Sequence, residues 1–285
     1  MSLLNFLARR FIAGETAKDA VLAAGRAKTA GIDAIIDFLG EDVKTAEGAV
    51  QAADEYIGLL RQLHQDQTQA AVSLKVSQMG LLVSRDLCLE NIRRVAGEAA
   101  RLGLFVWFDM EGSGLTQKTI EVFEALRENF QNLGLCLQAY LVRTGGDLDK
   151  LMRKPLHVRL CKGAYKEPQD IAYTAKSAVD GNFRMLVQKV FDQASHGVYP
   201  AFATHDPALI DYIRAQAREK KIGSAGFEFQ MLYGIQSRLL AQLAKEGFRA
   251  SVYIPYGSHW LPYFIRRLRE RKESLYFLLR NVFRA

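Results

Sequence analysis

Short apolar runs alternate with longer segments of helical periodicity along most of this chain. From residue 72 onward the runs have the length of strands, and apolar positions at helical spacing follow them. A strand followed by a helix, repeated many times, is typical of a parallel sheet. The expected strands are Val72–Met79, Phe105–Met110, Leu135–Leu141, His157–Cys161, Ala201–Thr204, Phe227–Leu232 and Ala250–Ile254. The expected helices are Cys88–Arg101, Gln117–Asn129, Lys176–Ser195, Ala208–Lys220 and Gln236–Glu246.

The first 68 residues have a different texture, with helical patterns and no strand-like run. Ala17–Thr29 is rich in Ala, Lys and Arg, and Thr45–Leu63 carries apolar residues at helical spacing. We therefore expect an N-terminal helical arm over residues 1–68. One catalytic barrel domain is expected over residues 69–285.

The number of strand–helix units decides between two parallel architectures. Seven units without a glycine-rich dinucleotide turn favour an α/β fold of the (β/α)8 type, a TIM-like barrel, over an open doubly wound sheet. The pattern leaves the eighth strand unassigned: either a short strand lies near Leu275–Leu278 or the barrel closes irregularly. Asp206 before Pro207 predicts a helix start, because aspartate caps and proline fits the first helical position.

Composition narrows the class of protein. Hydrophobic content of 49% and charged content of 24% are ordinary for a globular chain, and the apolar stretches are too short to cross a bilayer. The net charge of +7 comes without a basic patch interleaved with stacking aromatics, so no nucleic-acid partner is expected. A solvated basic surface is the favoured interpretation of this charge, and attraction to an anionic membrane face is a more plausible use of it than nucleic-acid binding.

The expected location is cytoplasmic, and a peripheral contact on the inner face of the cytoplasmic membrane is a weaker hypothesis. The basic, apolar ends Leu3–Ile12 and Leu275–Phe283 could make that contact, although packing against the barrel is the favoured alternative. Cys88, Cys136 and Cys161 show neither metal-ligand nor disulfide spacing, which indicates a reducing compartment and small core residues. The histidines show no metal spacing either, so no metal is expected.

Polar residues interrupt the expected strands at positions that should face inward. Helices cover the outer face of a parallel barrel, so that face must be apolar and the polar alternates point into the lumen. These residues are Lys75, Asp109, Gln138, Arg159 and Glu228, which we expect near the carboxyl ends of their strands. Buried charges are costly unless paired, so the set predicts a ligand-filled pocket. For Lys75 and Asp109, an ion pair that braces the barrel is the alternative.

Two segments add candidate ligand contacts. After the expected strand that holds Arg159, Gly163 and Ala164 permit close approach of a flat ring or a phosphate, and Lys162 could meet a phosphate as a point charge. An ordinary turn is the alternative. His205 ends another strand, where a structural and a ligand-binding role are equally expected.

Arg266 and Arg267 lie on an expected helix with Tyr263 on the same side. Guanidinium groups stay charged and offer forked donors to a small carboxylate. The alternative is a solvated helix in which Glu270 pairs with either arginine. Both arginines reach one anion only if the helix lies across the pocket mouth.

Eight motifs, in order over nearly the whole chain, resemble the proline dehydrogenase family, specifically its short monofunctional bacterial type. They are residues 10–15 (RFIAGE), 74–77 (LKVS), 108–111 (FDME), 138–140 (QAY), 159–165 (RLCKGAY), 203–207 (ATHDP), 227–234 (FEFQMLYG) and 263–270 (YFIRRLRE).

The resemblance implies a distorted barrel with the last helix over its mouth, non-covalent FAD, and oxidation of L-proline to 1-pyrroline-5-carboxylate, the first step of proline catabolism. It also implies electron transfer to a membrane quinone and a separate pyrroline-5-carboxylate dehydrogenase downstream. Arg159 would lie by flavin N5, and Asp109 would support the pocket. The implied substrate-binding residues are Lys75, Tyr165, Leu232, Tyr253, Tyr263, Arg266 and Arg267. The implied cofactor-binding residues are Met110, Gln138, Arg159, Lys162, Gly163, Ala164, Thr204, His205 and Gln230.

Ser274 departs from the family, which usually has Asn at this position, so a cofactor contact from it is not expected. Two other classes remain as alternatives. One is a lyase or aldolase in which Lys75 forms a Schiff base. The other is a non-catalytic basic scaffold that binds RNA or a membrane.

Overall fold

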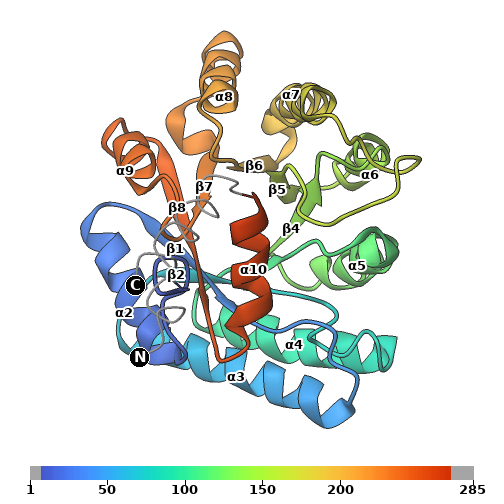
Figure 1. The fold of residues 1–285 in the computed structure, drawn as a ribbon, viewed down its shortest axis with the longest axis vertical. Helices are drawn as coiled ribbons and strands as arrows, with labels where there is room; N and C mark the ends of the chain where they lie inside the picture. The colour runs from blue at the N-terminus through green and yellow to red at the C-terminus, as the bar shows by residue number, and fades with distance from the viewer. Residues whose placement is uncertain (1–7, 271–285) are drawn as a thin grey trace, which may run out of the picture.

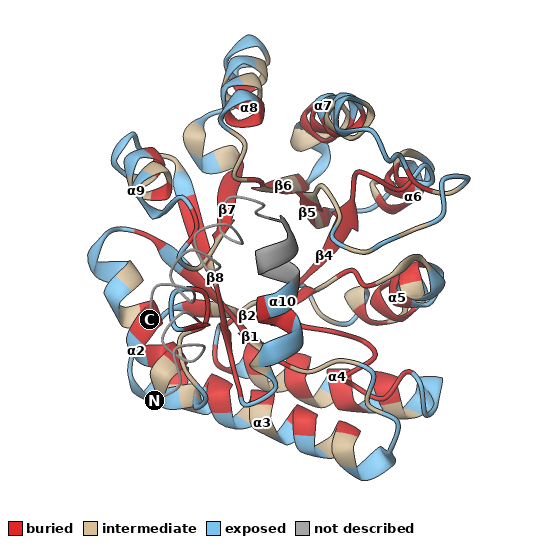
Figure 2. Ribbon diagram, viewed as in Figure 1, coloured by how far each residue is buried: buried red, intermediate tan, exposed pale blue. Residues whose placement is uncertain are grey.

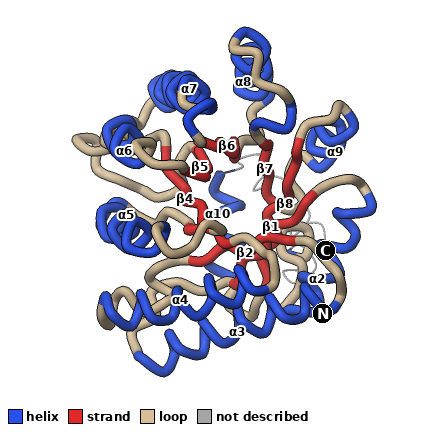
Figure 3. The backbone as a smooth tube through the Cα atoms, turned by 180° about the vertical axis from the view of Figure 1, so that it is seen from behind, coloured by secondary structure: helices blue, strands red, loops and turns tan. Residues whose placement is uncertain are grey.

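Eight parallel strands close into a barrel in sequence order (Figures 1 and 3). The computed structural model describes residues 8–270, with side chains up to residue 265. The strands are β1 (Asp33–Phe38), β2 (Ala70–Leu74), β3 (Val106–Phe108), β4 (Leu133–Gln138), β5 (Leu156–Cys161), β6 (Val198–Ala203), β7 (Glu228–Leu232) and β8 (Arg249–Tyr256). The expected (β/α)8 architecture is therefore confirmed, and the doubly wound sheet is excluded.

Helices surround the strands as an outer ring, and one of them crosses the end of the barrel. The described helices are α2 (Ala17–Thr29), α3 (Ala46–Gln65), α4 (Arg85–Arg101), α5 (Ser113–Arg127), α6 (Thr144–Leu151), α7 (Lys176–Asp192), α8 (Pro207–Glu219), α9 (Ser237–Lys245) and α10 (Trp260–Glu270). In Figure 1, α10 lies across the opening of the strand ring, and in Figure 3 it lies behind the strands.

The first strand corrects the expectation for residues 1–68. Asp33–Phe38 is not helical: it pairs with β2 on one side and with β8 on the other, and it closes the barrel. The division at residue 68 therefore falls inside the barrel. The segment was missed because Ile35 and Ile36 are adjacent and Asp33 and Asp37 flank them, so no period of two is visible. The short eighth strand that the sequence analysis allowed near Leu275–Leu278 lies outside the described residues.

The other seven expected strands are all present, with shifted ends. The largest difference is at β2, which ends at Leu74 rather than Met79, because the amides of Gln78 and Met79 donate to the carbonyl of Lys75 and turn the chain. Helix α6 was not predicted, since Gly145 and Gly146 weaken its helical signal. The cap at Asp206 is confirmed: its carboxylate accepts from the amide of Ala208 at 3.1 Å.

The two faces of the strands carry different chemistry, as expected for a covered barrel. Val72 and Leu74 on β2 point outward and are fully buried beneath the helices, as are Phe227 and Phe229 at β7. Buried positions continue along the inner faces of the outer helices (Figure 2). The alternate residues face the lumen and include polar side chains such as Ser73, together with a small apolar cluster of Ile35, Trp107 and Ala201.

The N-terminal segment packs on α10 and fixes the end of the barrel. Phe11 and Phe264 have ring centroids 6.1 Å apart, and both belong to a buried apolar cluster with Ile12 and Ile235. Gly234 permits the contact, because a Cβ there would lie 1.6 Å from the carbonyl oxygen of Arg10. Within residues 8–270, no helix has the length and apolarity that crossing a membrane requires.

Candidate active site

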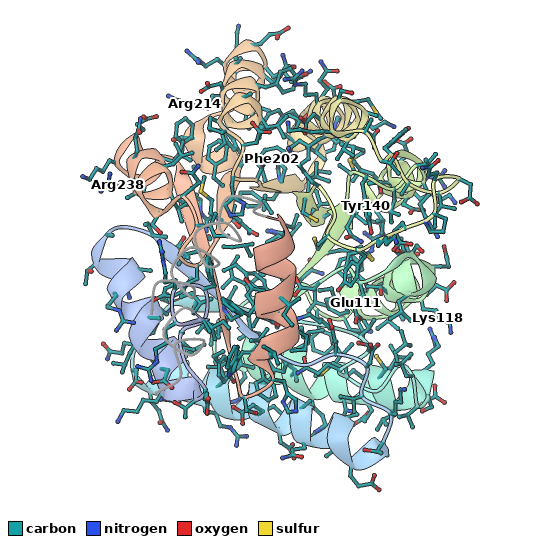
Figure 4. The ribbon with its side chains drawn as sticks, viewed as in Figure 1. Glu111, Lys118, Tyr140, Phe202, Arg214 and Arg238 are labelled. Atoms are coloured by element: carbon teal, nitrogen blue, oxygen red, sulfur yellow. The ribbon has the colours of Figure 1, made fainter. Side chains whose placement is uncertain are left out.

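A cavity of about 570 Å³ opens at the carboxyl ends of the strands, beneath α10. In Figure 4, Lys118 and Arg238 lie on the outer helices, whereas Glu111 lies closer to the centre. The predicted site residues on the cavity wall are Lys75, Asp109, Met110, Gln138, Arg159, Lys162, Gly163, Ala164, Tyr165, Thr204, His205, Gln230, Leu232, Tyr253 and Tyr263. Arg266 and Arg267 belong to α10, but their side chains lie outside the described residues.

Lys75 stands at the centre of the charged floor of this cavity. It follows the last residue of β2, and its Nζ lies 2.8 Å from Oδ1 of Asp37 and 3.6 Å from Oδ2 of Asp109. The ion pair with Asp109 that the sequence allowed is therefore present. The stronger partner, Asp37 on β1, was missed together with its strand.

Arg159 contacts the other oxygen of the Asp109 carboxylate. Its Nη1 donates to Oδ1 of Asp109 at 2.7 Å and to Oγ of Ser73 at 3.2 Å. The guanidinium carbon lies 4.6 Å from the ring centroid of Trp107 and 5.6 Å from that of Tyr253. Tyr253 in turn donates its hydroxyl to Oδ2 of Asp109 at 2.6 Å. Arg159 is thus held rigidly, as a positioned cation should be.

The two carboxylates beside Lys75 differ in the direction of their pKa shifts because they have different numbers of cationic partners. Burial alone raises the pKa of Asp109, but the charges of Lys75 and Arg159 outweigh it, so that pKa lies below its usual value. Asp37 is buried with one cation beside it, and burial raises its pKa. Burial lowers the pKa of Lys75, but the two carboxylates reverse this and raise it well above its usual value. Lys75 and Asp109 therefore remain ionised at neutral pH.

Unpartnered buried atoms lie beside these ion pairs. Among the residues that the structure describes, Nε and Nη2 of Arg159 and Oε1 of Gln230 have no hydrogen-bond partner. Gln138 donates its amide to the backbone oxygen of Glu111 at 2.8 Å, which orients its side chain. Buried polar atoms are normally satisfied, so these three atoms indicate a polar ligand in the cavity.

The segment after β5 supplies a second group of charges. Lys162 Nζ lies 2.6 Å from Asp180 and 2.9 Å from Asp206, and Lys176 also contacts both carboxylates. Burial raises the pKa of Asp206, but hydrogen bonds from the two lysines lower it to about 2. Asp206 thus does more than cap α8: it holds Lys162 at the edge of the cavity.

Only glycine fits the backbone conformation and the close packing at position 163. Its φ is +115°, and a Cβ at this position would lie 2.1 Å from the ring of Tyr140. Tyr140 donates to Glu167, which also accepts from the backbone amide of Ser113 at 2.7 Å. The close approach predicted for Gly163 therefore includes an aromatic side chain of the protein itself.

His205 is fixed in one tautomer by the backbone. Its Nε2 accepts a hydrogen bond of 2.9 Å from the amide of Leu232, so the ring proton resides on Nδ1. The side chain thus has a structural role, and it also lines the cavity. The ligand-binding role that the sequence left open for His205 stays a prediction.

One inward polar residue belongs to the other end of the barrel. Glu228 is the first residue of β7, not a residue near its carboxyl end, and it lines a separate pocket of about 360 Å³ at the amino ends of the strands. The alternation of side chains correctly predicted that Glu228 points into the lumen. It did not predict the position of Glu228 along the barrel axis, because that position depends on the register of β7 with its neighbours.

Sequence reasoning also missed the two thiols on the cavity wall. Cys136 on β4 and Cys161 on β5 have sulfur atoms 3.6 Å apart. Their separation of 25 positions resembles no disulfide or metal motif. Only the pairing of β4 with β5 brings them together. The one signal in the sequence that could have found them is alternation, which places both side chains on the inward faces of their strands.

Together, the fold and cavity define a (β/α)8-barrel enzyme with its site at the carboxyl ends of the strands. The family model described as "Proline dehydrogenase" matches residues 20–280. The chain is 38% identical to "Proline dehydrogenase" of Deinococcus radiodurans, over 98% of this chain and 91% of that protein. It is 36% identical to "Proline dehydrogenase 1" of Bacillus subtilis subsp. natto, over 96% and 90% of the two chains.

Solved structures agree with the barrel. The crystal structure of proline utilization A from Bdellovibrio bacteriovorus, inactivated by N-propargylglycine, matches with a TM-score of 0.86 and 26% identity. The match covers 94% of this chain, which spans about a third (33%) of that longer protein. The chain belongs to the proline dehydrogenase family, and the resemblance seen in the sequence is confirmed.

Proposed function

We propose that this chain oxidises L-proline to 1-pyrroline-5-carboxylate with non-covalently bound FAD, as the first step of proline catabolism. The observation that carries the proposal is the buried cluster of Lys75, Asp109 and Arg159. Two of its members are ion-paired cations on the wall of a cavity, and one of these keeps unpartnered donors.

The residues at the cavity fit a flavin, on which this family depends. A flavin ring presents acceptors along one edge and an amide-like edge, and Nε and Nη2 of Arg159 and Oε1 of Gln230 lack partners among residues 8–265. Lys162 lies at the rim, where it suits the phosphates. Bound FAD would accept a hydride from the ring carbon next to the proline nitrogen.

The described residues proposed to hold the substrate line the same cavity, where Lys75 and Tyr253 share Asp109 with Arg159. The ammonium group of Lys75 has three N–H bonds and donates one of them to Asp37. It can therefore donate another hydrogen bond to the proline carboxylate. Arg266 and Arg267 would complete the carboxylate site from α10. Tyr253, held through Asp109, would wall the pyrrolidine ring with Tyr165, Leu232 and Tyr263. Several cations on one carboxylate convert binding energy into alignment of the ring.

The Schiff-base alternative is disfavoured by the charge of Lys75. A nucleophilic lysine must be neutral, which proteins achieve by lowering its pKa. Here Asp37 and Asp109 overcome burial and raise that pKa. No borohydride-trapped adduct at Lys75 is therefore expected with a carbonyl substrate.

The fate of the electrons and the product belongs to the same proposal. We infer that a membrane quinone accepts the electrons and that a separate pyrroline-5-carboxylate dehydrogenase consumes the product. A peripheral contact with the inner membrane face would bring the two electron carriers together. Binding to anionic liposomes at low salt tests this contact without involving catalysis.

A visible spectrum of the purified protein, before and after anaerobic L-proline, tests cofactor and substrate together. We expect flavin bands that bleach on addition of L-proline and do not bleach with D-proline. A protein that stays colourless after incubation with FAD would contradict the proposal. If flavin bands are present but L-proline leaves them unchanged, the cofactor assignment would stand and L-proline would be excluded as the substrate.

The arginines of α10 provide a sharper test of the carboxylate site. Arg266→Met and Arg267→Met should each raise the KM for proline strongly, by about 10-fold or more, because a hydrogen bond to a charged group is lost. Flavin occupancy should stay near normal. Arg238→Met on α9 is the matched control, since this helix lies in the outer ring (Figure 4). Loss of flavin without a change in KM would contradict the assignment.

A further inference from the structure

Cys136 and Cys161 form a pair of free thiols inside the active-site cavity. Their sulfur atoms lie 3.6 Å apart, Cys136 is buried, and Cys161 is partly exposed on the cavity wall. The remaining cysteine, Cys88, lies in α4 against the carbonyl of Val76 and does not line the cavity. The pair therefore has a geometry and an environment that the third thiol lacks.

The strand register makes a direct disulfide unfavourable. Cys136 pairs with Arg159, and Cys161 pairs with Gln138, so the cysteines are diagonal neighbours two residues apart in register. Two residues of rise and one interstrand spacing separate such Cα atoms by about 8 Å. Disulfides usually join Cα atoms less than about 7 Å apart. The sulfurs are close because the side chains lean toward each other, while the backbones stay apart.

The same spacing suits one atom held between the two sulfurs. Zinc–sulfur bonds of about 2.3 Å at a tetrahedral angle place two sulfurs about 3.8 Å apart. Zinc needs further ligands, and residues 8–265 contain no cluster of three or more His, Cys, Asp or Glu that could hold a metal ion. A thiophile that is satisfied by two sulfur bonds fits better, and soft thiolates select such soft elements.

The surroundings also favour reaction of the pair. The hydrogen bond with Cys161 and the charge of Arg159 lower the pKa of Cys136, although burial acts in the opposite direction, whereas the same hydrogen bond and burial raise the pKa of Cys161. Thiolates rather than thiols are the nucleophiles and ligands. Cys136 can thus form the first bond, after which Cys161 is already within reach for the second.

We propose that Cys136 and Cys161 constitute a dithiol site, within the active-site cavity, for thiophilic ligands that make two sulfur bonds, of which trivalent arsenicals are the representative class. With phenylarsine oxide, two arsenic–sulfur bonds form, and the two thiol protons leave with the arsenical oxygen as water. Arsenic stays trivalent, so no oxidant or reductant is consumed. A ligand held here occupies space beside Arg159 and blocks the cavity.

Intact-mass spectrometry of the purified protein with phenylarsine oxide tests the site without relying on catalysis. We expect one arsenical per chain, retained in excess 2-mercaptoethanol and removed by 2,3-dimercaptopropanol. Cys136→Ala and Cys161→Ala should each weaken retention by about 100-fold, because the second bond gains its strength from proximity. Cys88→Ala is the matched control and should retain the adduct.

Three outcomes would overturn the proposal. They are an adduct that survives in either cavity variant, an adduct that is lost in Cys88→Ala, and the absence of any adduct on a folded wild-type protein. Rapid formation of a Cys136–Cys161 disulfide with diamide would overturn the spacing argument as well. If Cys136→Ala does not fold, Cys161→Ala, at the more exposed position, carries the test alone.

Discussion

The two ends of this barrel both enclose polar residues, yet they organise them differently. At the carboxyl end, Lys75 pairs with Asp37 at 2.8 Å and Arg159 pairs with Asp109 at 2.7 Å, and donors of Arg159 stay unpartnered among the described residues. At the amino end, Arg249 and Asp33 are 3.9 Å apart, near the limit of an ion pair. Buried polarity alone therefore does not locate an active site; rigid charge with remaining capacity for a ligand does.

Aromatic rings, rather than ion pairs, fill the amino end. The ring of His157 lies 5.0 Å from that of Phe105 and 5.2 Å from that of Tyr199, and Arg249 lies 5.5 Å from the Tyr199 ring. Burial raises the pKa of Glu228 and outweighs the hydrogen bond from Gln230 and the charges of Arg249 and Arg159, which lower it; Ser251 also donates to this carboxylate. This end is organised to close the barrel, since its polar groups satisfy one another or approach neutrality.

Removal of Asp109 should show the largest difference between the ends. Asp109→Asn removes the carboxylate that Lys75 and Arg159 share, so both buried cations lose a partner. The free energy of unfolding should therefore fall by about 3 kcal/mol at neutral pH. Because the pKa of Asp109 is lowered in the folded state, its contribution is present above its unfolded pKa and is lost as pH falls through the folded pKa. Urea unfolding with saturating flavin should show the difference between wild type and variant shrinking below about pH 4.

Paired arginine substitutions should separate the two ends by activity. Arg159→Met removes the cation beside the proposed flavin, and we expect the rate of anaerobic flavin reduction by proline to fall about 100-fold. Arg249→Met removes a half-exposed cation from the amino end, where the rate should change by no more than about 2-fold. Equal losses in the two variants would remove the functional distinction between the ends.

A pair of glycines gives a smaller test of the same comparison. Gly163→Ala combines a positive φ of +115° with a Cβ that meets Tyr140, whereas Gly103→Ala has a φ of +70° and no atom within 4 Å. Both should lose about 1–2 kcal/mol of unfolding free energy from strain. Only Gly163→Ala should also weaken FAD binding, measured by fluorescence titration, because Tyr140 must move beside the cavity. Weaker FAD binding in Gly103→Ala would contradict this.

Glu228→Gln should have the smallest effect, with the opposite dependence on pH. The pKa of Glu228 is raised in the folded state, so its stabilising contribution is present below its unfolded pKa and is lost as pH rises through the folded pKa. The variant should therefore gain stability relative to wild type as pH rises, by about 1 kcal/mol or less. Urea unfolding at several pH values measures this, and a relative loss with rising pH would show that Glu228 is held ionised.

The sequence by itself determined the repeating architecture and the direction of the inward side chains. Covered parallel strands must be apolar outside, so Lys75, Gln138 and Arg159 could be assigned to the lumen from alternation alone. Capping residues likewise predicted where a helix begins, as at Asp206. These inferences succeed because period and capping are local properties of a few successive residues.

Tertiary structure decided which distant residues became partners. Asp37 became the closest carboxylate of Lys75 only when β1 closed the barrel, and Cys136 met Cys161 only through the register of β4 and β5. The height of Glu228 along the lumen was set in the same way. Alternation gives the face of a strand but not its register, because register is fixed by packing between segments that lie far apart in the chain.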